Sequence, residues 1–157
     1  MAKFDRIRCG VIGYGGAFNM GKTHLTSMAL NPRMDVAAVC EIDKARREAA
    51  HEDFPGIQTY ANVASMLKSA DLDLVTIITP HNTHAKLAIQ CLNAGINVVS
   101  EKPLAITSKE VKEMMRAAKL NGVMLSTFHN RRWDGDFQTL RNLIHREKIV
   151  GRVHRIE

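Results

Sequence analysis

The sequence predicts an α/β fold in which a doubly wound, mostly parallel sheet lies between two layers of helices. Short apolar runs rich in β-branched residues alternate with helical patterns along the whole chain, as expected for repeated βαβ units. A glycine-rich segment directly follows the first run, and polar motifs follow later ones. Because ligands bind beyond the carboxyl ends of the strands in such sheets, these segments are the candidate functional sites.

The composition is that of one ordinary water-soluble domain. Of the 157 residues, 45% are hydrophobic and 24% charged, and no apolar run reaches the about 20 residues needed to cross a bilayer. Residues 1–15 contain no apolar core of a signal peptide, so we expect a cytoplasmic protein. Cys9, Cys40 and Cys91 lie far apart without metal-ligand spacing, which predicts reduced thiols, no disulfide and no metal site.

The net charge of +6 at pH 7 favours an anionic partner. A phosphate-bearing cofactor or substrate meets this requirement as well as a nucleic acid does. Aromatic residues make up only 5% of the chain and do not alternate with basic ones. We therefore expect a small-molecule partner and neither a nucleic acid nor a membrane.

Six apolar runs predict the strands of the sheet. They are short, and most contain several β-branched residues, which favour extended backbone. In chain order they span residues 7–12, 36–40, 57–60, 74–78, 96–99 and 123–127.

Apolar periodicity predicts the helices between these strands. Apolar residues at positions i, i+3, i+4 and i+7 begin at Val63, Ala85 and Val111, and each set predicts one buried helix face. A last helix is expected over residues 136–146, where Phe137 starts an apolar side.

Helix boundaries follow from local chemistry. A first helix is expected to end near Leu30, and Gly95 and Gly122 stand where two later helices should stop. Thr107 and Glu110 form a capping-box pattern, which places the start of the helix that ends before Gly122.

The glycine-rich segment predicts a dinucleotide site. Gly13 allows a tight turn and Gly15 lets the backbone approach a pyrophosphate, which the next helix N-terminus would hold. Phe18 stands where the third glycine is expected, so the loop must bulge before a helix that starts near Gly21. The candidate cofactor-binding residues here are Gly13, Gly15, Gly16, Phe18 and Asn19.

The same segment also matches a P-loop. Residues 16–23 fit the pattern G-x-x-x-x-G-K-[ST], with Lys22 for the β- and γ-phosphates and Thr23 for magnesium. Glu41 could then support the metal ion. A third alternative is that these glycines only make a tight turn between strand and helix.

Glu41 fits the dinucleotide interpretation better, because it ends the second strand about 20 residues after the glycines. There its carboxylate would accept the ribose hydroxyls and repel the 2′-phosphate of NADP, which favours NAD. Lys44, Arg46 and Arg47 follow closely and weaken that repulsion, so NADP is not excluded. Alternatively, Glu41 is an exposed charge at a strand end.

Two further strand ends carry motifs. Thr79-Pro80-His81-Asn82-Thr83-His84 follows one strand, and Glu101-Lys102-Pro103 follows the next. With the glycine loop and residues 128–133, they resemble the glucose-fructose oxidoreductase, inositol dehydrogenase and rhizopine catabolism (Gfo/Idh/MocA) family. The resemblance implies a Rossmann fold, and the Glu-Lys-Pro motif is its most specific mark.

The resemblance also implies roles for these residues. Lys102 would be catalytic, positioning substrate hydroxyls and assisting proton movement, and the Lys102-Pro103 bond would be cis. The alternative for Lys102 is a surface ion pair with Glu101. His84 would lie near the ribose or nicotinamide, or else only cap a helix or face solvent. Trp133 would pack at a domain junction. The implied cofactor-binding residues are Thr79, Pro80, His81, Asn82, His84, Glu101, Lys102, Pro103 and Arg132.

By resemblance, residues 1–147 form the dinucleotide-binding domain and residues 148–157 begin a truncated second domain. The expected function is hydride transfer between the nicotinamide of NAD(P) and a secondary alcohol of a sugar or polyol such as inositol. The family's second domain supplies an Asp and a His for proton transfer and usually the homo-oligomer contacts, so this chain alone should be inactive. A non-catalytic NAD-binding redox sensor and a P-loop NTPase remain as alternatives.

Overall fold

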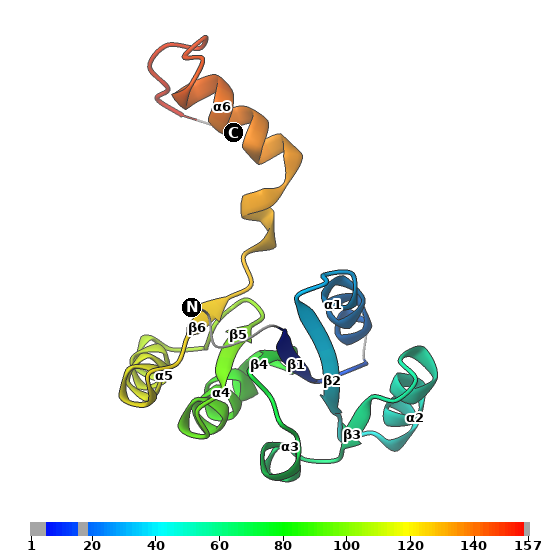
Figure 1. The fold of residues 1–157 in the computed structure, drawn as a ribbon. Coiled ribbons are helices and arrows are strands. Elements are labelled where there is room, and N and C mark those ends of the chain that lie inside the picture. The colour runs from blue at the N-terminus through cyan, green and yellow to red at the C-terminus, as the bar shows by residue number, and fades with distance from the viewer. Residues whose placement is uncertain (1–5, 16–18, 156–157) are drawn as a thin grey trace.

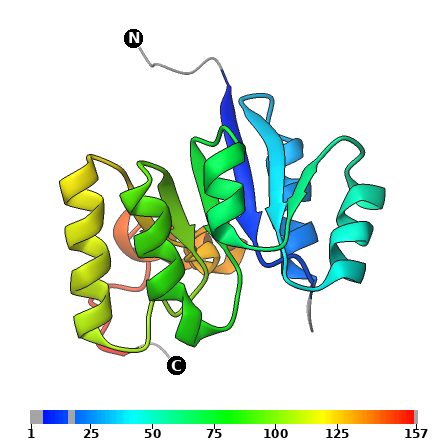
Figure 2. The ribbon, with the colours of Figure 1, turned by 90° about the horizontal axis from the view of Figure 1, so that it is seen from below.

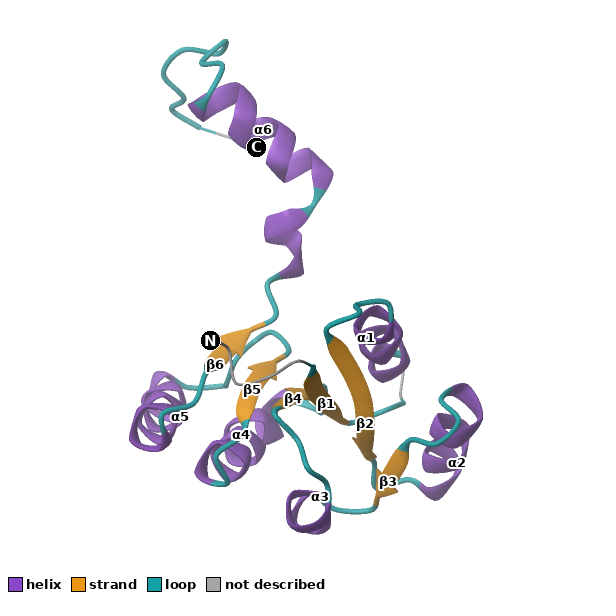
Figure 3. Ribbon diagram, in the orientation of Figure 1, coloured by secondary structure: helices purple, strands orange, loops and turns teal. Residues whose placement is uncertain are grey.

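The computed structural model describes residues 6–15 and 19–155, and it contains a six-stranded parallel sheet with helices on both faces (Figures 1 and 3). The strand order is β3-β2-β1-β4-β5-β6, and every pair of neighbours is parallel. The order reverses between β1 and β4, which opens a crevice at the carboxyl ends of these two strands. The predicted doubly wound α/β fold is confirmed.

All six predicted strands are present, with ends shifted by at most two residues. Parallel strands that are covered on both faces read as nearly continuous apolar runs, which is why the sequence located them well. Their bounds are β1 Ile7–Ile12, β2 Met34–Cys40, β3 Gln58–Tyr60, β4 Leu74–Ile77, β5 Asn97–Ser100 and β6 Leu125–Thr127.

The helices agree with the sequence in all but one case. The α-helices are α1 Met20–Ala29, α2 Lys44–Asp53, α3 Val63–Ser69, α4 His84–Asn93, α5 Ser108–Asn121 and α6 Gly135–His145, with short 3-10 turns at η1 His81–Thr83 and η2 Asn130–Trp133. The predicted capping box of α5 is confirmed. The Thr107 hydroxyl accepts a hydrogen bond from the backbone N–H of Glu110 at 3.2 Å, and the Glu110 carboxylate accepts one from the backbone N–H of Thr107 at 2.8 Å.

Helix α2 was not among the predicted elements. Its sequence carries no apolar stripe, and Ala50 is its only buried residue. Its start is fixed instead by Asp43, whose side chain accepts a hydrogen bond from the backbone N–H of Arg46 at 2.9 Å. A helix that packs through two adjacent alanines, Ala49 and Ala50, gives no periodic signal.

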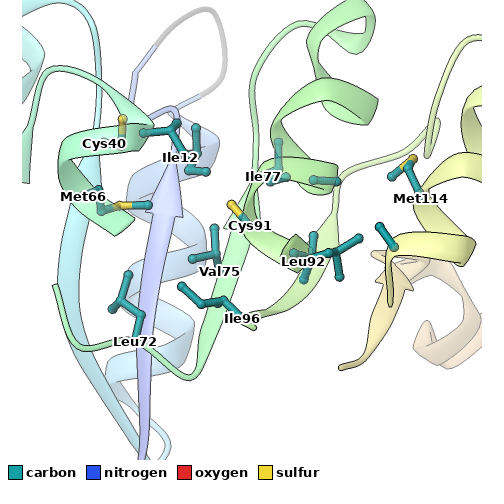
Figure 4. Packing of buried hydrophobic residues seen from close by; sticks show 14 of the residues in the cluster. Ile12, Cys40, Met66, Leu72, Val75, Ile77, Cys91, Leu92, Ile96 and Met114 are labelled. Carbon is teal, nitrogen blue, oxygen red and sulfur yellow. The ribbon is translucent and has the colours of Figure 1, made fainter. Parts of the chain in front are cut away.

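The two faces of the sheet have separate cores. Helices α1 and α2 cover one face, and α3, α4 and α5 cover the other (Figure 1). In Figure 2, α4 (green) and α5 (yellow-green) lie side by side in front of the sheet. Figure 4 shows the larger cluster, in which Cys91 and Leu92 of α4 pack with Val75 and Ile77 of β4.

Helix α6 stands away from the sheet. The chain leaves β6 through η2, and α6 projects beyond the body of the domain (Figure 1). No residue of α6 is buried, and Phe137 and Leu140 are each 45% exposed. The predicted helix is therefore confirmed, whereas its apolar side does not contribute to the core of the sheet. In residues 6–15 and 19–155 no helix is both long and apolar enough to cross a membrane.

The three cysteines are buried free thiols. Burial raises the pKa of Cys9 and of Cys40 to about 11, and that of Cys91 to about 12. Because the thiolate is the reactive form, a thiol that is both buried and protonated reacts slowly.

We expect the folded chain to resist a thiol-reactive maleimide at mildly alkaline pH. Intact-mass measurement should find no label on the native chain and three labels after unfolding in urea, one for each cysteine. Rapid labelling of the native chain at any of these cysteines would contradict the packing described here.

Candidate functional site

The turn after β1 is built closely against the neighbouring strands. Gly13 has a φ of +92°, and a Cβ there would come within 3.1 Å of the Ile78 carbonyl oxygen. The backbone N–H of Gly13 donates to the Cys40 carbonyl at 2.8 Å. Both constraints suit glycine, as expected for the first glycine of a dinucleotide loop.

Gly21 takes the role of the displaced third glycine. Helix α1 begins at Met20, after Asn19 in the left-handed region with φ 48°. A Cβ on Gly21 would lie 2.5 Å from Tyr14 Cα and 2.7 Å from the Gly13 carbonyl oxygen. The glycine thus permits the close packing of helix against strand end that the fingerprint requires. Two predicted loop residues, Gly16 and Phe18, lie outside the described residues.

The Glu41 carboxylate holds the glycine loop through hydrogen bonds to its backbone. Its Oε2 accepts hydrogen bonds from the backbone N–H groups of Tyr14 at 2.9 Å and Gly15 at 3.4 Å, and its Oε1 accepts one from Asp43 at 3.0 Å. Glu41 is only 6% exposed, so the alternative of an exposed strand-end charge is wrong. The carboxylate fixes the loop, and an ionised carboxylate has about four acceptor positions.

The side chains that the P-loop alternative assigns to phosphate and magnesium bind protein groups instead. Lys22 Nζ lies 2.5 Å from Asp53 Oδ1, and the Tyr14 hydroxyl donates to Asp53 Oδ2 at 2.6 Å. These two hydrogen bonds, with the Lys22 bond the larger cause, lower the pKa of Asp53. Burial, followed by the bond to Asp53, raises the pKa of Tyr14. The Thr23 hydroxyl donates to the Asn19 carbonyl at 3.2 Å, so this geometry disfavours a nucleoside triphosphate site.

The Glu-Lys-Pro corner follows β5. The Lys102-Pro103 peptide bond is cis, which confirms the prediction. The Glu101 carboxylate accepts a hydrogen bond from the backbone N–H of Lys102 at 3.2 Å, and its other oxygen lies 2.8 Å from His24 Nε2. Within the described chain, the side-chain partner of the Glu101 carboxylate is thus His24 and not the Lys102 ammonium. Lys102 itself is exposed.

Sequence reasoning missed His24. It lies on α1, is 6% exposed, and its ring meets Phe128 edge-on with centroids 4.5 Å apart. His24 and Glu101 are separated by 77 positions, and the sequence carries no spacing rule that joins them. Their contact links the helix of the glycine loop directly to the Glu-Lys-Pro corner.

His84 is buried beneath the segments that follow β4 and β5. It is 0% exposed, with Nδ1 at 2.9 Å from the Pro103 carbonyl oxygen and Nε2 at 2.8 Å from the Thr79 carbonyl oxygen. The alternative in which His84 only caps a helix or faces solvent is wrong. The ring joins the segment after β4 to the segment after β5.

The other predicted residues lie around these corners. The hydroxyls of Thr79 and Thr83 are 2.6 Å apart at the end of β4, and Pro80, His81 and Asn82 are exposed just after it. The structure places Arg132 farther away, on η2 beyond the edge strand β6. There it borders an open cavity of about 710 Å³, whose lining also includes Val99 and Phe128.

The register of the sheet brings these segments to one edge. Ile12, at the end of β1, pairs with Ile77 of β4, and Ile77 pairs with Ser100 of β5. The glycine loop, residues 79–84 after β4 and the Glu-Lys-Pro corner after β5 therefore all begin at the carboxyl ends of their strands, next to one another. An extended ligand could contact all of them at the crevice between β1 and β4.

A protein-family model described as "Oxidoreductase family, NAD-binding Rossmann fold" matches residues 7–129. The chain belongs to this Gfo/Idh/MocA family. The resemblance inferred from the motifs is thereby confirmed, and the described sheet is the family's NAD-binding Rossmann domain.

Three members of the family illustrate the similarity. The oxidoreductase YdgJ of Escherichia coli is 38% identical over 95% of this chain and 41% of its own length. The NADP(+) scyllo-inositol 2-dehydrogenase IolW of Bacillus subtilis is 35% identical over 90% of this chain and 38% of its own. The structure of the WlbA dehydrogenase of Bordetella pertussis with NADH and UDP-GlcNAcA matches with a TM-score of 0.85 and 27% identity, over 95% of this chain and 44% of its own. This chain thus spans about two fifths of the length of these relatives.

The close packing of Gly21 predicts a strong effect of Gly21→Ala. We expect a loss of about 2 kcal/mol in the free energy of unfolding, because the new methyl group meets backbone atoms that cannot move independently. Gly135→Ala is the matched control, since a Cβ there meets nothing within 4 Å and alanine favours a helix. Urea unfolding followed by circular dichroism measures both, and equal stabilities would contradict the described packing.

The contact between His24 and Glu101 predicts a second stability effect. His24→Ala leaves the Glu101 carboxylate, which is 13% exposed, without its side-chain partner, so we expect a loss of about 2 kcal/mol in the free energy of unfolding. His24→Gln, whose amide can donate in place of Nε2, should recover part of the loss. His145→Ala is the control, because His145 is exposed at the end of α6. Urea unfolding of all variants is the measurement, and an alanine variant as stable as the parent would count against the contact.

Proposed function

We propose that this chain is the cofactor-binding part of an NAD(P)-dependent oxidoreductase. The reaction we propose is hydride transfer between the nicotinamide and a secondary alcohol of a sugar or polyol such as inositol. The observation that carries the proposal is the 2.8 Å contact between His24 and Glu101. It supports one continuous site in which the glycine loop and Lys102 face opposite ends of a single dinucleotide.

The glycine loop fits a pyrophosphate. Gly13 and Gly15 allow the ligand to approach the backbone, and the free N–H groups at the start of α1 favour an anion. Arg46 adds a positive charge here, since its Cδ lies within 2.6 Å of where a Cβ on Gly15 would stand. A bound dinucleotide supplies the hydride donor or acceptor, while the protein supplies binding and orientation.

The preferred cofactor is NAD, with NADP tolerated. The Glu41 carboxylate keeps an acceptor position for a ribose hydroxyl and repels a 2′-phosphate. Arg46 lies over Gly15, and Arg47 donates to the Glu41 carbonyl at 2.7 Å, so two guanidinium groups offset that repulsion. Among the relatives, IolW is named as an NADP(+) enzyme.

Lys102 is the proposed catalytic residue of this chain. Its side chain is exposed at the cis corner, at the same edge of the sheet as the glycine loop. There it would position substrate hydroxyls and assist proton movement. The remaining cofactor contacts would come from the segments after β4 and β5 and from Arg132.

The remaining features of the whole protein follow the family resemblance. We propose a dinucleotide-binding domain over residues 1–147 and the start of a second domain over residues 148–157. That domain would supply the Asp and His for proton transfer and the contacts of a homo-oligomer, so this chain alone should bind cofactor without turnover. The buried, protonated thiols fit a cytoplasmic location.

Calorimetric titration with NADH, NADPH and Mg-ATP tests the proposal. We expect NADH to bind more tightly than NADPH, and Mg-ATP not to bind. Lys22→Ala should leave NADH affinity within about two-fold, because its ammonium pairs with Asp53. Binding of Mg-ATP that is lost in Lys22→Ala, together with no dinucleotide binding, would establish the P-loop alternative instead.

A further inference from the structure

The His84 ring is held between two hydrogen-bond acceptors. Nδ1 faces the Pro103 carbonyl oxygen at 2.9 Å, and Nε2 faces the Thr79 carbonyl oxygen at 2.8 Å. A neutral imidazole has one donor nitrogen and one acceptor nitrogen, whereas a carbonyl oxygen only accepts. The two hydrogen bonds therefore coexist only when both ring nitrogens carry a proton.

A neutral ring would be poorly matched to this site. One nitrogen lone pair would then face a carbonyl oxygen at less than 3 Å, and His84 is 0% exposed, so water cannot intervene. Burying an unpaired polar group of this kind is costly. His84 lies at the N-terminus of α4, where the positive end of the helix dipole disfavours a positive charge on the ring. The negative ends of the two carbonyl dipoles, which face the ring, offset this effect.

The titratable groups around His84 come from three segments. His81 of η1 meets the ring edge-on, with centroids 5.7 Å apart. Glu101 and Lys102 immediately precede Pro103 in the corner after β5, and the Glu101 carboxylate is bonded to His24. On α4 itself, Lys86 is exposed. Within residues 6–15 and 19–155 no carboxylate bonds to the ring, whose hydrogen-bond partners are the two backbone carbonyls.

We propose that His84 is a doubly protonated positioning residue that ties the corner after β4 to the corner after β5. Its two bonds fix Pro103, and with it Lys102, relative to Thr79 before a ligand arrives. When the ring loses its second proton, one bond is lost and the two corners can separate. If the proposed function holds, dinucleotide affinity then decreases as the pH rises.

The protonation state can be measured without any ligand. In the unliganded, ¹⁵N-labelled chain, nitrogen–proton correlation spectra report whether each ring nitrogen carries a proton. We expect both ring nitrogens of His84 to carry a hydrogen-bonded proton at mildly acidic pH, as its two carbonyl contacts require. A neutral tautomer of His84 with one unprotonated nitrogen at mildly acidic pH would overturn the proposal.

Two variants separate the two bonds. The Asn amide nitrogen can replace Nδ1, so His84→Asn keeps the bond to Pro103, and the Gln amide nitrogen can replace Nε2, so His84→Gln keeps the bond to Thr79. We expect each to bind NADH about five-fold more weakly than the parent at neutral pH, as for one lost hydrogen bond. Neither should retain the parent's decrease in affinity with rising pH.

The control is His145→Asn, an exposed histidine at the end of α6 outside the proposed site, which should bind NADH like the parent and keep its pH dependence. Parental affinity and pH dependence in both His84 variants would overturn the positioning role. If the unmodified chain does not bind NADH at all, the proposed function fails, while the ring spectra still decide whether His84 carries two protons.

Discussion

The lateral register of β1, β4 and β5 is the constraint on which the site depends. Ile12, Ile77 and Ser100 stand side by side because the strands are parallel and paired in this register. The three segments that follow must then emerge together at the crevice where the strand order reverses. A shift of one residue in any of these pairings would turn the side chains of that strand to the opposite face.

Buried polar side chains gather at this same edge. Glu41 holds the glycine loop, His24 holds Glu101, and His84 holds the carbonyls of Thr79 and Pro103. Burial of such groups is costly unless they are hydrogen-bonded. The fold places these groups where they fix loop backbones next to a candidate ligand site, and the rest of the core is almost entirely apolar.

The sheet domain and the segment that follows it differ in how they are stabilised. The sheet and its helices form two continuous cores, whereas η2 and α6 contribute no buried residue. The family match ends at residue 129, where the chain leaves the sheet. The candidate site depends on the first part, since its residues, apart from Arg132, lie on or beside the strands β1, β2, β4 and β5.

The sequence by itself determined the strands, most helices and the motifs at the strand ends. These signals are local: apolar runs for buried strands, periodic faces for α3, α4 and α5, and the Thr107–Glu110 capping box. Helix α2 gave no such signal, because it packs on the core through two adjacent alanines, Ala49 and Ala50. Sequence reasoning thus succeeded where burial imposes a pattern on neighbouring residues.

Only the tertiary structure decided how the site residues use their side chains. The sequence left Lys22 open to a phosphate, Glu41 to a ribose or to solvent, and His84 to a cofactor, while the fold gave each of them a protein partner. His24 entered the site through Glu101, 77 positions away. Such contacts join residues from different βα units, and their geometry follows from the packing of helices on the sheet, which no local pattern encodes.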